Sequence, residues 1–326
     1  MANARLESLR EMLRERQQET ITSIEHARRR LEDLAALTAP LPGTSFEAVR
    51  AGGIAGEWAT APGACDDGSV VYLHGGGYGL GSVATHRALV SRLSRASGFR
   101  VLAVDYRLAP EHPFPAAVED AVEAVRWLRR QGTASADVVL AGDSAGGGLA
   151  VATLLALREQ GEPLPAGAVC LSPWVDLEAT GESTTAHAHC DPMVSRDELL
   201  LMAALYLRGA DPRSPLASPV HGDLRGLPPL LVQVGTSEAL LDDAVRLVER
   251  VRAAGGEARL ERWRDMIHVW HAFAPLLPEA RAAIARAGAW IRARLGRRRR
   301  PLRAPARAVR ARSIGSVRRR SRIVAR

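Results

Sequence analysis

The chain contains no lysine, so all 44 basic residues among its 326 are arginines. It also lacks any apolar run approaching the roughly 18 uninterrupted residues that a membrane helix needs. The N-terminus is charged from the start and has no apolar stretch of the kind found in secretory signals. We therefore expect a cytoplasmic protein without a transmembrane segment.

Cysteine is equally scarce, with only Cys65, Cys170 and Cys190 in the whole chain. An odd number of cysteines without any CxxC spacing argues against a disulfide framework and against a structural zinc site. The sequence predicts isolated thiols instead, because unpaired cysteine behaves as a small hydrophobic residue in most protein cores.

Acidic residues are absent from residues 297–326, which carry thirteen arginines. Subtracting these from the formal net charge of +8 leaves about −5 for residues 1–296. A segment with so few large apolar residues cannot offset the entropy lost on ordering, so we predict a disordered arginine-rich tail. Such a tail leaves non-specific binding of nucleic acid or anionic lipid open. Because no aromatic residues are interleaved with the arginines, we expect no specific nucleic-acid partner.

The remainder has the composition of a globular protein, with 47% hydrophobic and 25% charged residues. Short apolar runs alternate there with amphipathic helical patterns, which predicts an α/β fold with a mostly parallel central sheet flanked by helices. The strand candidates are residues 70–73, 101–104, 138–140, 168–171 and 230–234, and the helix candidates are 117–130, 147–160 and 242–254.

Two segments depart from this alternation. In residues 1–40, leucine and isoleucine recur every three to four positions between charged residues, which predicts helices at the N-terminus. Residues 176–226 contain polar loop residues, several prolines and one apolar helix at 198–207. We expect N-terminal cap helices in 1–40 and an α/β core in 41–296, with a cap insertion near 176–226.

The strongest chemical signal is the sequence Gly-Asp-Ser-Ala-Gly at 142–146, between a predicted strand and a predicted helix. A serine on a sharp strand-to-helix turn is the nucleophile elbow of serine hydrolases. Side chains two positions to either side would collide in such a turn, and Gly142 and Gly146 remove them. We therefore predict that Ser144 is a nucleophile.

A second signal, His-Gly-Gly-Gly-Tyr at 74–78, directly follows another predicted strand. Consecutive glycines expose backbone N–H groups, which suits an oxyanion hole. We expect its donors to be the N–H groups of Gly76, Gly77 and Ala145. His74 is interpreted as a structural histidine that braces the loop. The segment lacks the Lys-Ser/Thr ending of a phosphate-binding loop.

Together with the segment DYRLAPEHPFPAAVEDA, these motifs resemble the hormone-sensitive-lipase-like family of α/β-hydrolases, which includes bacterial carboxylesterases. The resemblance covers about residues 45–295 and implies an α/β-hydrolase fold, a Ser–acid–His triad and a cap built partly from N-terminal helices. The segment VGTSEALLDD and the downstream half are most similar to the monoterpene ε-lactone hydrolase subgroup.

The histidine of the triad is expected after the last strand, since the order along the chain is serine, acid, histidine. His268 and His271 both follow the strand-like residues 257–263. The family pattern of a histidine two positions before an aromatic residue selects His268, and His271 is the competing candidate.

The acid is the position where the sequence departs from the family. Many members carry Asp-Pro-Leu-x-Asp after the preceding strand, and here the first aspartate of that pattern falls on Glu238 and the second on Asp242. A glutamate can also orient a histidine and stabilise its charged form. We predict that Glu238 is the acid and that Asp242 caps the following helix.

Two polar clusters are interpreted as structural. Residues 105–111 are a family hallmark, and we expect Asp105, Arg107 and Glu111 to form a polar network that braces the loop under the active site. A second cluster could be mistaken for a metal site, but histidines two apart on an extended segment point in opposite directions, so we expect a loop. Its members are His187, His189, Cys190 and Asp191.

These patterns predict a serine carboxylesterase that hydrolyses short-chain esters through an acyl-enzyme, without a metal or an organic cofactor. One alternative is an ε-lactone (monoterpene lactone) hydrolase, so the expected partner is a small-molecule ester or lactone. A distant alternative is a non-catalytic small-molecule receptor on the same fold, which the presence of both Ser144 and His268 disfavours. Apolar residues on the C-terminal helix could serve a homodimer, although core packing explains them equally well.

Overall fold

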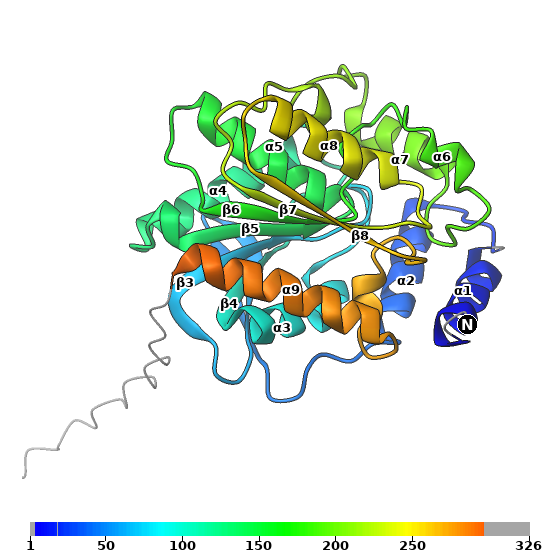
Figure 1. Cartoon of the computed structure of the whole chain (residues 1–326), viewed down its shortest axis with the longest axis horizontal. Coiled ribbons are helices and arrows are strands. Elements are labelled where there is room, and N and C mark those ends of the chain that lie inside the picture. Colours follow the sequence, from blue (N-terminus) through cyan, green and yellow to red (C-terminus); the bar gives the residue numbers. More distant parts are fainter. Residues whose placement is uncertain (1–3, 18, 297–326) are drawn as a thin grey trace, which may run out of the picture.

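The computed structural model describes residues 4–17 and 19–296, and within them eight strands form one sheet in the order β1-β2-β4-β3-β5-β6-β7-β8 (Figure 1). From β4 to β8 all neighbouring strands are parallel, whereas β1 and β2 join antiparallel at one edge. The strands are β1 (Ser45–Ala51), β2 (Ile54–Thr60), β3 (Cys65–Leu73), β4 (Phe99–Val104), β5 (Val138–Asp143), β6 (Gly167–Leu171), β7 (Leu230–Gly235) and β8 (Ala258–Trp263).

Helices cover both faces of this sheet, with α4, α5 and α8 on one side and α3 and α9 on the other (Figure 1). The predicted α/β-hydrolase type of architecture, a mostly parallel sheet flanked by helices, is therefore present. The helices are α1 (Ala4–Gln17), α2 (Ile24–Ala35), α3 (Val83–Ser97), α4 (Ala116–Arg130), α5 (Ala145–Glu159), α6 (Ser183–Ala186), α7 (Arg196–Leu207), α8 (Leu241–Ala253) and α9 (Pro278–Leu295), with short 3-10 turns η1 (Ser135–Asp137), η2 (Pro219–His221) and η3 (Trp270–Phe273).

The strands that could be predicted from the sequence are those buried on both faces of the sheet. The central strands β3 and β5 are enclosed on both faces, so they consist of continuous apolar runs such as Val70–Leu73. β1 is largely exposed, and the sequence pattern did not reveal it or its partner β2. The two strands form a hairpin through Gly52 and Gly53, which both adopt positive φ.

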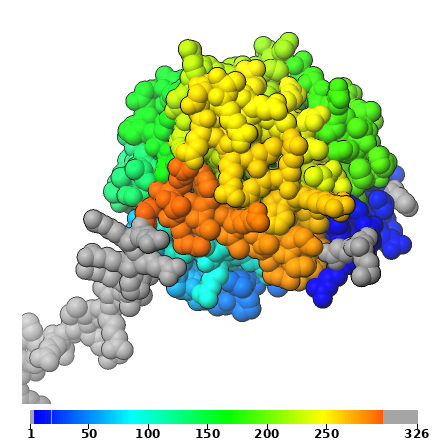
Figure 2. Space-filling view, viewed as in Figure 1, coloured from blue at the N-terminus to red at the C-terminus, as the bar shows by residue number. Residues whose placement is uncertain are grey.

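The N-terminal residues form two helices, in agreement with the helical pattern of residues 1–40. α1 buries Leu6, Leu9 and Leu13 on one face, as their spacing predicts. α2 begins after Ser23, whose side chain accepts a hydrogen bond from the N–H of His26. Figure 2 shows these helices, in blue, at the edge of the molecule beside the segment that follows β8.

The expected network of Asp105, Arg107 and Glu111 is not present, because each of the three bonds to a different partner. Asp105 accepts the N–H of Val83, and Arg107 pairs with Asp120 and Glu119. Glu111 forms a bidentate ion pair with Arg28 of α2, with two N–O distances of 2.7 Å. Arg28 also donates to the carbonyl oxygens of Gly79 and Ala109, so this guanidinium ties α2 to two loops of the core.

Three further expectations concern the cysteines, the absence of a transmembrane segment and the C-terminal tail. The three cysteines are free, with Cys65 and Cys170 buried. Among the described helices, none has both the length and the apolar character required to cross a bilayer. The arginine-rich tail at 297–326 lies outside the described residues.

Candidate active site

Ser144 occupies a sharp turn between β5 and α5, with φ of 52° and ψ of −123°. Few residues other than glycine adopt positive φ, so the turn is strained and is held by its surroundings. A Cβ atom at Gly142 would lie 2.2 Å from the carbonyl oxygen of Gly146, and one at Gly146 would lie 2.0 Å from that of Leu73. Both glycines are thus sterically required for the turn that presents Ser144.

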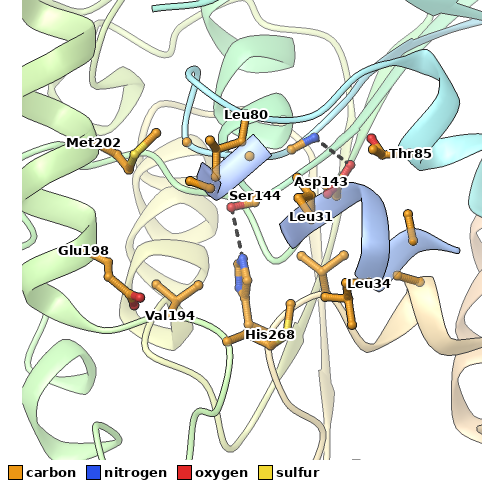
Figure 3. Close-up of a pocket in the computed structure, with 18 of the residues that line it drawn as sticks. Leu31, Leu34, Leu80, Thr85, Asp143, Ser144, Val194, Glu198, Met202 and His268 are labelled. Carbon is orange, nitrogen blue, oxygen red and sulfur yellow. Dashed lines mark hydrogen bonds between the residues drawn. The ribbon is translucent and has the colours of Figure 1, made fainter. Parts of the chain in front are cut away.

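His268 lies against this serine, in the loop between β8 and η3. Its Nε2 is 3.0 Å from Oγ of Ser144, and Figure 3 shows the two side chains pointing toward one another. His271 instead places its Nε2 3.0 Å from Oε1 of Gln233, and burial lowers the pKa of His271 to about 3. The structure therefore brings His268, and not His271, to Ser144.

Glu238 lies behind His268, in the turn between β7 and α8. Its Oε1 is 3.8 Å from Nδ1 of His268, which is an ion-pair distance and longer than a hydrogen bond. Neither atom has another hydrogen-bond partner among the described residues, so Glu238 Oε1 is the available acceptor for the Nδ1–H of His268.

Asp242 is oriented differently, with its Oδ2 accepting the N–H of Ser183 at 2.8 Å. The predicted capping role of Asp242 is also wrong, because α8 is preceded by Leu240 and has no side-chain cap.

Ser172, at the end of β6, connects the two partners. Its Oγ donates to Oε2 of Glu238 at 2.9 Å and accepts the N–H of Val269 at 3.2 Å, next to His268. No sequence pattern distinguishes this serine. It lies directly after a buried strand, at the carboxyl edge of the sheet where functional residues of α/β proteins gather.

Burial and neighbouring charges shift the pKa values of His268 and Glu238 in opposite directions. Burial by itself lowers the pKa of His268, but the carboxylates of Glu238, Asp191 and Asp143 together outweigh burial, and the pKa lies above the ordinary value. Burial also raises the pKa of Glu238, while His268 and Ser172 oppose that effect. A histidine stabilised in its charged form by a buried carboxylate is suited to take a proton from Ser144.

The glycine loop after β3 provides hydrogen-bond donors beside the serine. Within the described residues, the N–H groups of Gly76 and Gly77 donate to no protein acceptor, nor does that of Ala145, the first residue of α5. Gly76 and Gly77 border the same cavity as Ser144. His74 braces the loop, because its ring stacks on Tyr106 at 4.3 Å and the Tyr106 hydroxyl donates to the His74 carbonyl oxygen. Burial lowers the pKa of His74 to about 3, so this imidazole is neutral.

A cavity of about 510 Å³ opens over Ser144 and His268. Leu31 and Leu34 of α2 form one side, and Val194 and Met202 form the other (Figure 3). Most of the lining is apolar, and Ala27 of α2 lies within it. Such a lining suits a small substrate with an apolar portion near the serine.

Comparison with known proteins identifies the family. Residues 70–272 match a family model described as the alpha/beta hydrolase fold. An acetyl-hydrolase from Streptomyces hygroscopicus is 52% identical over 250 residues, which cover 77% of this chain and 83% of the relative. The chain belongs to the α/β-hydrolase family, in its hormone-sensitive-lipase-like branch, and is a carboxylic ester hydrolase.

Solved structures agree with this assignment of the hydrolase. An esterase from the bacterial hormone-sensitive lipase family has a TM-score of 0.89 and 52% identity, covering 91% of this chain and all of that one. EstE5, in a crystal soaked with p-nitrophenyl butyrate, has a TM-score of 0.86 and 46% identity, covering 90% and 99% of the two chains.

The cluster at residues 187–191 forms the predicted loop, but two buried acidic residues of this hydrolase make contacts that the sequence did not reveal. Asp143, directly before Ser144, accepts hydrogen bonds from the Tyr72 hydroxyl and the N–H of Gly75. Asp191, from the cluster weighed as a metal site, is buried and accepts the N–H of Ala239, next to Glu238. His187 of that cluster places Nδ1 3.0 Å from the carbonyl oxygen of Glu238. The cluster therefore contacts the turn that carries Glu238.

A different group of residues has the spacing of metal ligands within the described part of the hydrolase. Oxygen and nitrogen atoms of Asp176, Glu178 and His221 lie within 4.8 Å of one another. Arg246 places a positive charge 2.8 Å from Asp176, which already balances that carboxylate. None of these residues lines the cavity over Ser144.

Proposed function

We propose that this ester hydrolase is a serine carboxylesterase that cleaves short-chain carboxylic esters through a Ser144–Glu238–His268 triad and an acyl-enzyme. The observation that carries the proposal is the 3.0 Å contact between Oγ of Ser144 and Nε2 of His268. A hydrogen bond between nucleophile and base is the arrangement that activates a serine hydroxyl.

In the first half of the reaction, His268 takes the proton of Ser144 as Oγ attacks the ester carbonyl carbon. The carbonyl oxygen becomes an oxyanion, which the N–H groups of Gly76, Gly77 and Ala145 would stabilise. His268 then gives the proton to the departing alkoxide, so an alcohol leaves and the acyl group remains on Ser144.

In the second half, His268 removes a proton from water as the water oxygen attacks the acyl carbon. The intermediate collapses to a carboxylic acid, and the proton returns to Oγ of Ser144. Glu238 stays ionised and holds the imidazole in position, which requires the 3.8 Å separation to shorten by less than 1 Å. Catalytic hydrogen bonds are commonly long before substrate binds and tighten in the complex.

The cap forms part of the proposal. We propose that α2 and residues 193–205 form a cap over the serine, because both contribute to the lining of the cavity. Short acyl chains are supported by two relatives, one named an acetyl-hydrolase and one soaked with p-nitrophenyl butyrate. Because both names point to open-chain acyl groups, an ε-lactone serves as a comparison substrate.

The test is hydrolysis of p-nitrophenyl esters from acetate to palmitate, alongside an ε-lactone. The enzymes are wild type, Ser144→Ala, Glu238→Gln and the matched control Asp242→Asn. We expect cleavage of the short esters, at least a ~10³-fold loss of kcat for the first two variants, and little change for Asp242→Asn.

Three results would contradict parts of this proposal. Retained activity in Ser144→Ala would exclude the nucleophile. Near-full activity in Glu238→Gln with collapse in Asp242→Asn would transfer the role of the acid to Asp242. A preference for the lactone over every open-chain ester would replace the proposed substrate class.

A further inference from the structure

The turn that carries Glu238, residues 235–240 and here called the acid turn, is held by a segment far away in the sequence. Asp191 accepts the N–H of Ala239 at 2.8 Å, and His187 contacts the carbonyl oxygen of Glu238. Ser183 donates its hydroxyl to the carbonyl oxygen of Ala239 at 2.7 Å. The same segment continues into Met193, which lines the cavity. One piece of chain therefore contacts both the acid turn and the substrate cavity.

Asp191 is the charged member of this contact and is only 4% exposed. Its Oδ2 accepts the N–H of Ala239, and its Oδ1 accepts the N–H of Met193 at 2.9 Å. Both oxygens thus act as acceptors from backbone N–H groups. An ionised carboxylate can only accept, whereas a protonated one would have to donate through one oxygen. Burial raises the pKa of Asp191, whereas His268 and the N–H groups of Ala239 and Met193 oppose that effect and favour the ionised form.

We infer that Asp191 is a positioning residue for the reaction: its carboxylate fixes the acid turn beside Glu238 and adds a second negative charge behind His268. This inference rests on the proposed function, because it assigns a role relative to the Ser144–Glu238–His268 triad. A residue that only filled space would not need an ionised side chain that is almost completely buried, since burying a charge is costly.

The titratable groups around His268 come from four elements, and three of these groups are carboxylates. Glu238 faces it from the acid turn, Asp191 from the segment after α6, and Asp143 from the end of β5. All three carboxylates raise the pKa of His268 against the opposing effect of burial. His271, in η3, is the nearby imidazole and is neutral, because burial lowers its pKa to about 3.

Asp242 provides a matched control within the same contact. Like Asp191, it accepts one backbone N–H across the contact, that of Ser183. Unlike Asp191, it is not among the charges that act on His268. Its Oδ2 alone accepts that bond, so an asparagine can preserve it. Asp242→Asn removes a carboxylate from the contact but no charge that acts on His268, whereas Asp191→Asn removes both. Comparing the two variants therefore isolates the effect of the charge near His268.

The experiment measures kcat/KM for p-nitrophenyl butyrate from pH 5 to pH 9 in full-length wild type, Asp191→Asn, Asp191→Glu and Asp242→Asn. The acid limb of this profile reports the ionisation of His268 in the free enzyme. We expect the midpoint of the acid limb to lie above pH 6.5 in wild type. In Asp191→Asn we expect this midpoint to be lower by about 0.5–1 pH unit. Asp191→Glu retains the charge, so its limb should match wild type while its kcat falls. Asp242→Asn should match wild type.

A second measurement does not depend on turnover. The rate at which phenylmethanesulfonyl fluoride inactivates each enzyme reports the reactivity of Ser144, and its pH dependence should show the same shift for Asp191→Asn. Thermal unfolding of each variant confirms that the fold persists at the assay temperature.

An Asp191→Asn limb that coincides with wild type would overturn the inference, as would an equal shift in Asp242→Asn or in Asp191→Glu. Those failures leave the proposed function intact, because wild type would still hydrolyse the ester. If wild type is inactive on every ester, the proposed function itself has failed and the inference fails with it.

Discussion

The carboxylate of Asp143 accepts a hydrogen bond of 3.0 Å from the N–H of Gly75. This bond joins the residue before Ser144 to the first glycine of the loop that contains Gly76 and Gly77. The Tyr72 hydroxyl donates to the same oxygen at 2.6 Å, and the interactions of Asp143 with His86 and Tyr72 help to outweigh burial, so its pKa is lowered to about 2. The anion therefore persists at any pH at which the hydrolase would be assayed.

The first prediction follows from this link. Asp143→Ala leaves the Gly75 N–H without its acceptor, and an unpaired buried donor costs about 1–3 kcal/mol, so the glycine loop should shift. We expect kcat to fall by about 10², the order seen when one oxyanion donor is lost. Asp143→Asn keeps an oxygen for Gly75 and should lose less. The measurement is kcat and KM for p-nitrophenyl butyrate at pH 8, and equal losses in both variants would contradict the link.

A second prediction concerns chain length. Ala27→Trp places a large ring in the cavity from α2, so it should exclude longer acyl chains and spare acetate. Each buried methylene contributes about 0.8 kcal/mol, which is roughly fourfold in kcat/KM. We expect the ratio of octanoate to acetate kcat/KM to fall by about tenfold or more. Arg29→Trp, at an exposed position of the same helix, is the control. An equal loss for all chain lengths would contradict the assignment of this cavity to the acyl group.

A third prediction concerns stability and pH. Asp243 is fully buried, and burial raises its pKa to about 7. Its Oδ2 accepts the N–H groups of Val175 and Asp176, whereas its Oδ1 has no partner among the described residues. Because the folded pKa exceeds the ordinary value of 3.8, the protonated native state is favoured at low pH. That stabilisation is lost as the pH rises from about 4 through 7.

Asp243→Asn should remove this dependence, because its amide can keep an oxygen toward Val175 and Asp176. We expect the unfolding free energy of the variant relative to wild type to increase by about 2–3 kcal/mol between pH 5 and pH 8. Urea unfolding at the two pH values measures it. Asp197→Asn, at an exposed position of α7, should show no such change. If the difference between Asp243→Asn and wild type is the same at both pH values, Asp243 does not titrate in this range.

Much of the fold could be predicted from the sequence, for physical reasons. Strands such as β3 and β5 are buried on both faces, so their composition alone reveals them. The half-exposed hairpin of β1 and β2 has no such signature. Ser144 was found because a strand-to-helix turn that exposes a serine requires Gly142 and Gly146.

The supporting residues could not be predicted in the same way. Asp143 and Gly75 are 68 positions apart, and Asp191 and Ala239 are 48 apart, so only the folded chain shows that they meet. Asp191 lies in a loop, as predicted, but no sequence pattern shows which distant backbone group its side chain contacts. Asp242 follows Glu238 closely and has the same charge, and only the direction of its side chain toward Ser183 distinguishes the two.

The proposed mechanism requires Ser144 to carry the acyl group during turnover. In the test of this requirement, the enzyme is mixed with p-nitrophenyl butyrate and the reaction is quenched in acid within the first turnover. The added mass is then mapped by peptide mass spectrometry. We expect one butyryl group on the peptide containing Ser144, and no addition to that peptide in Ser144→Ala. A butyryl group on another residue, or hydrolysis by Ser144→Ala at the wild-type rate, would contradict it.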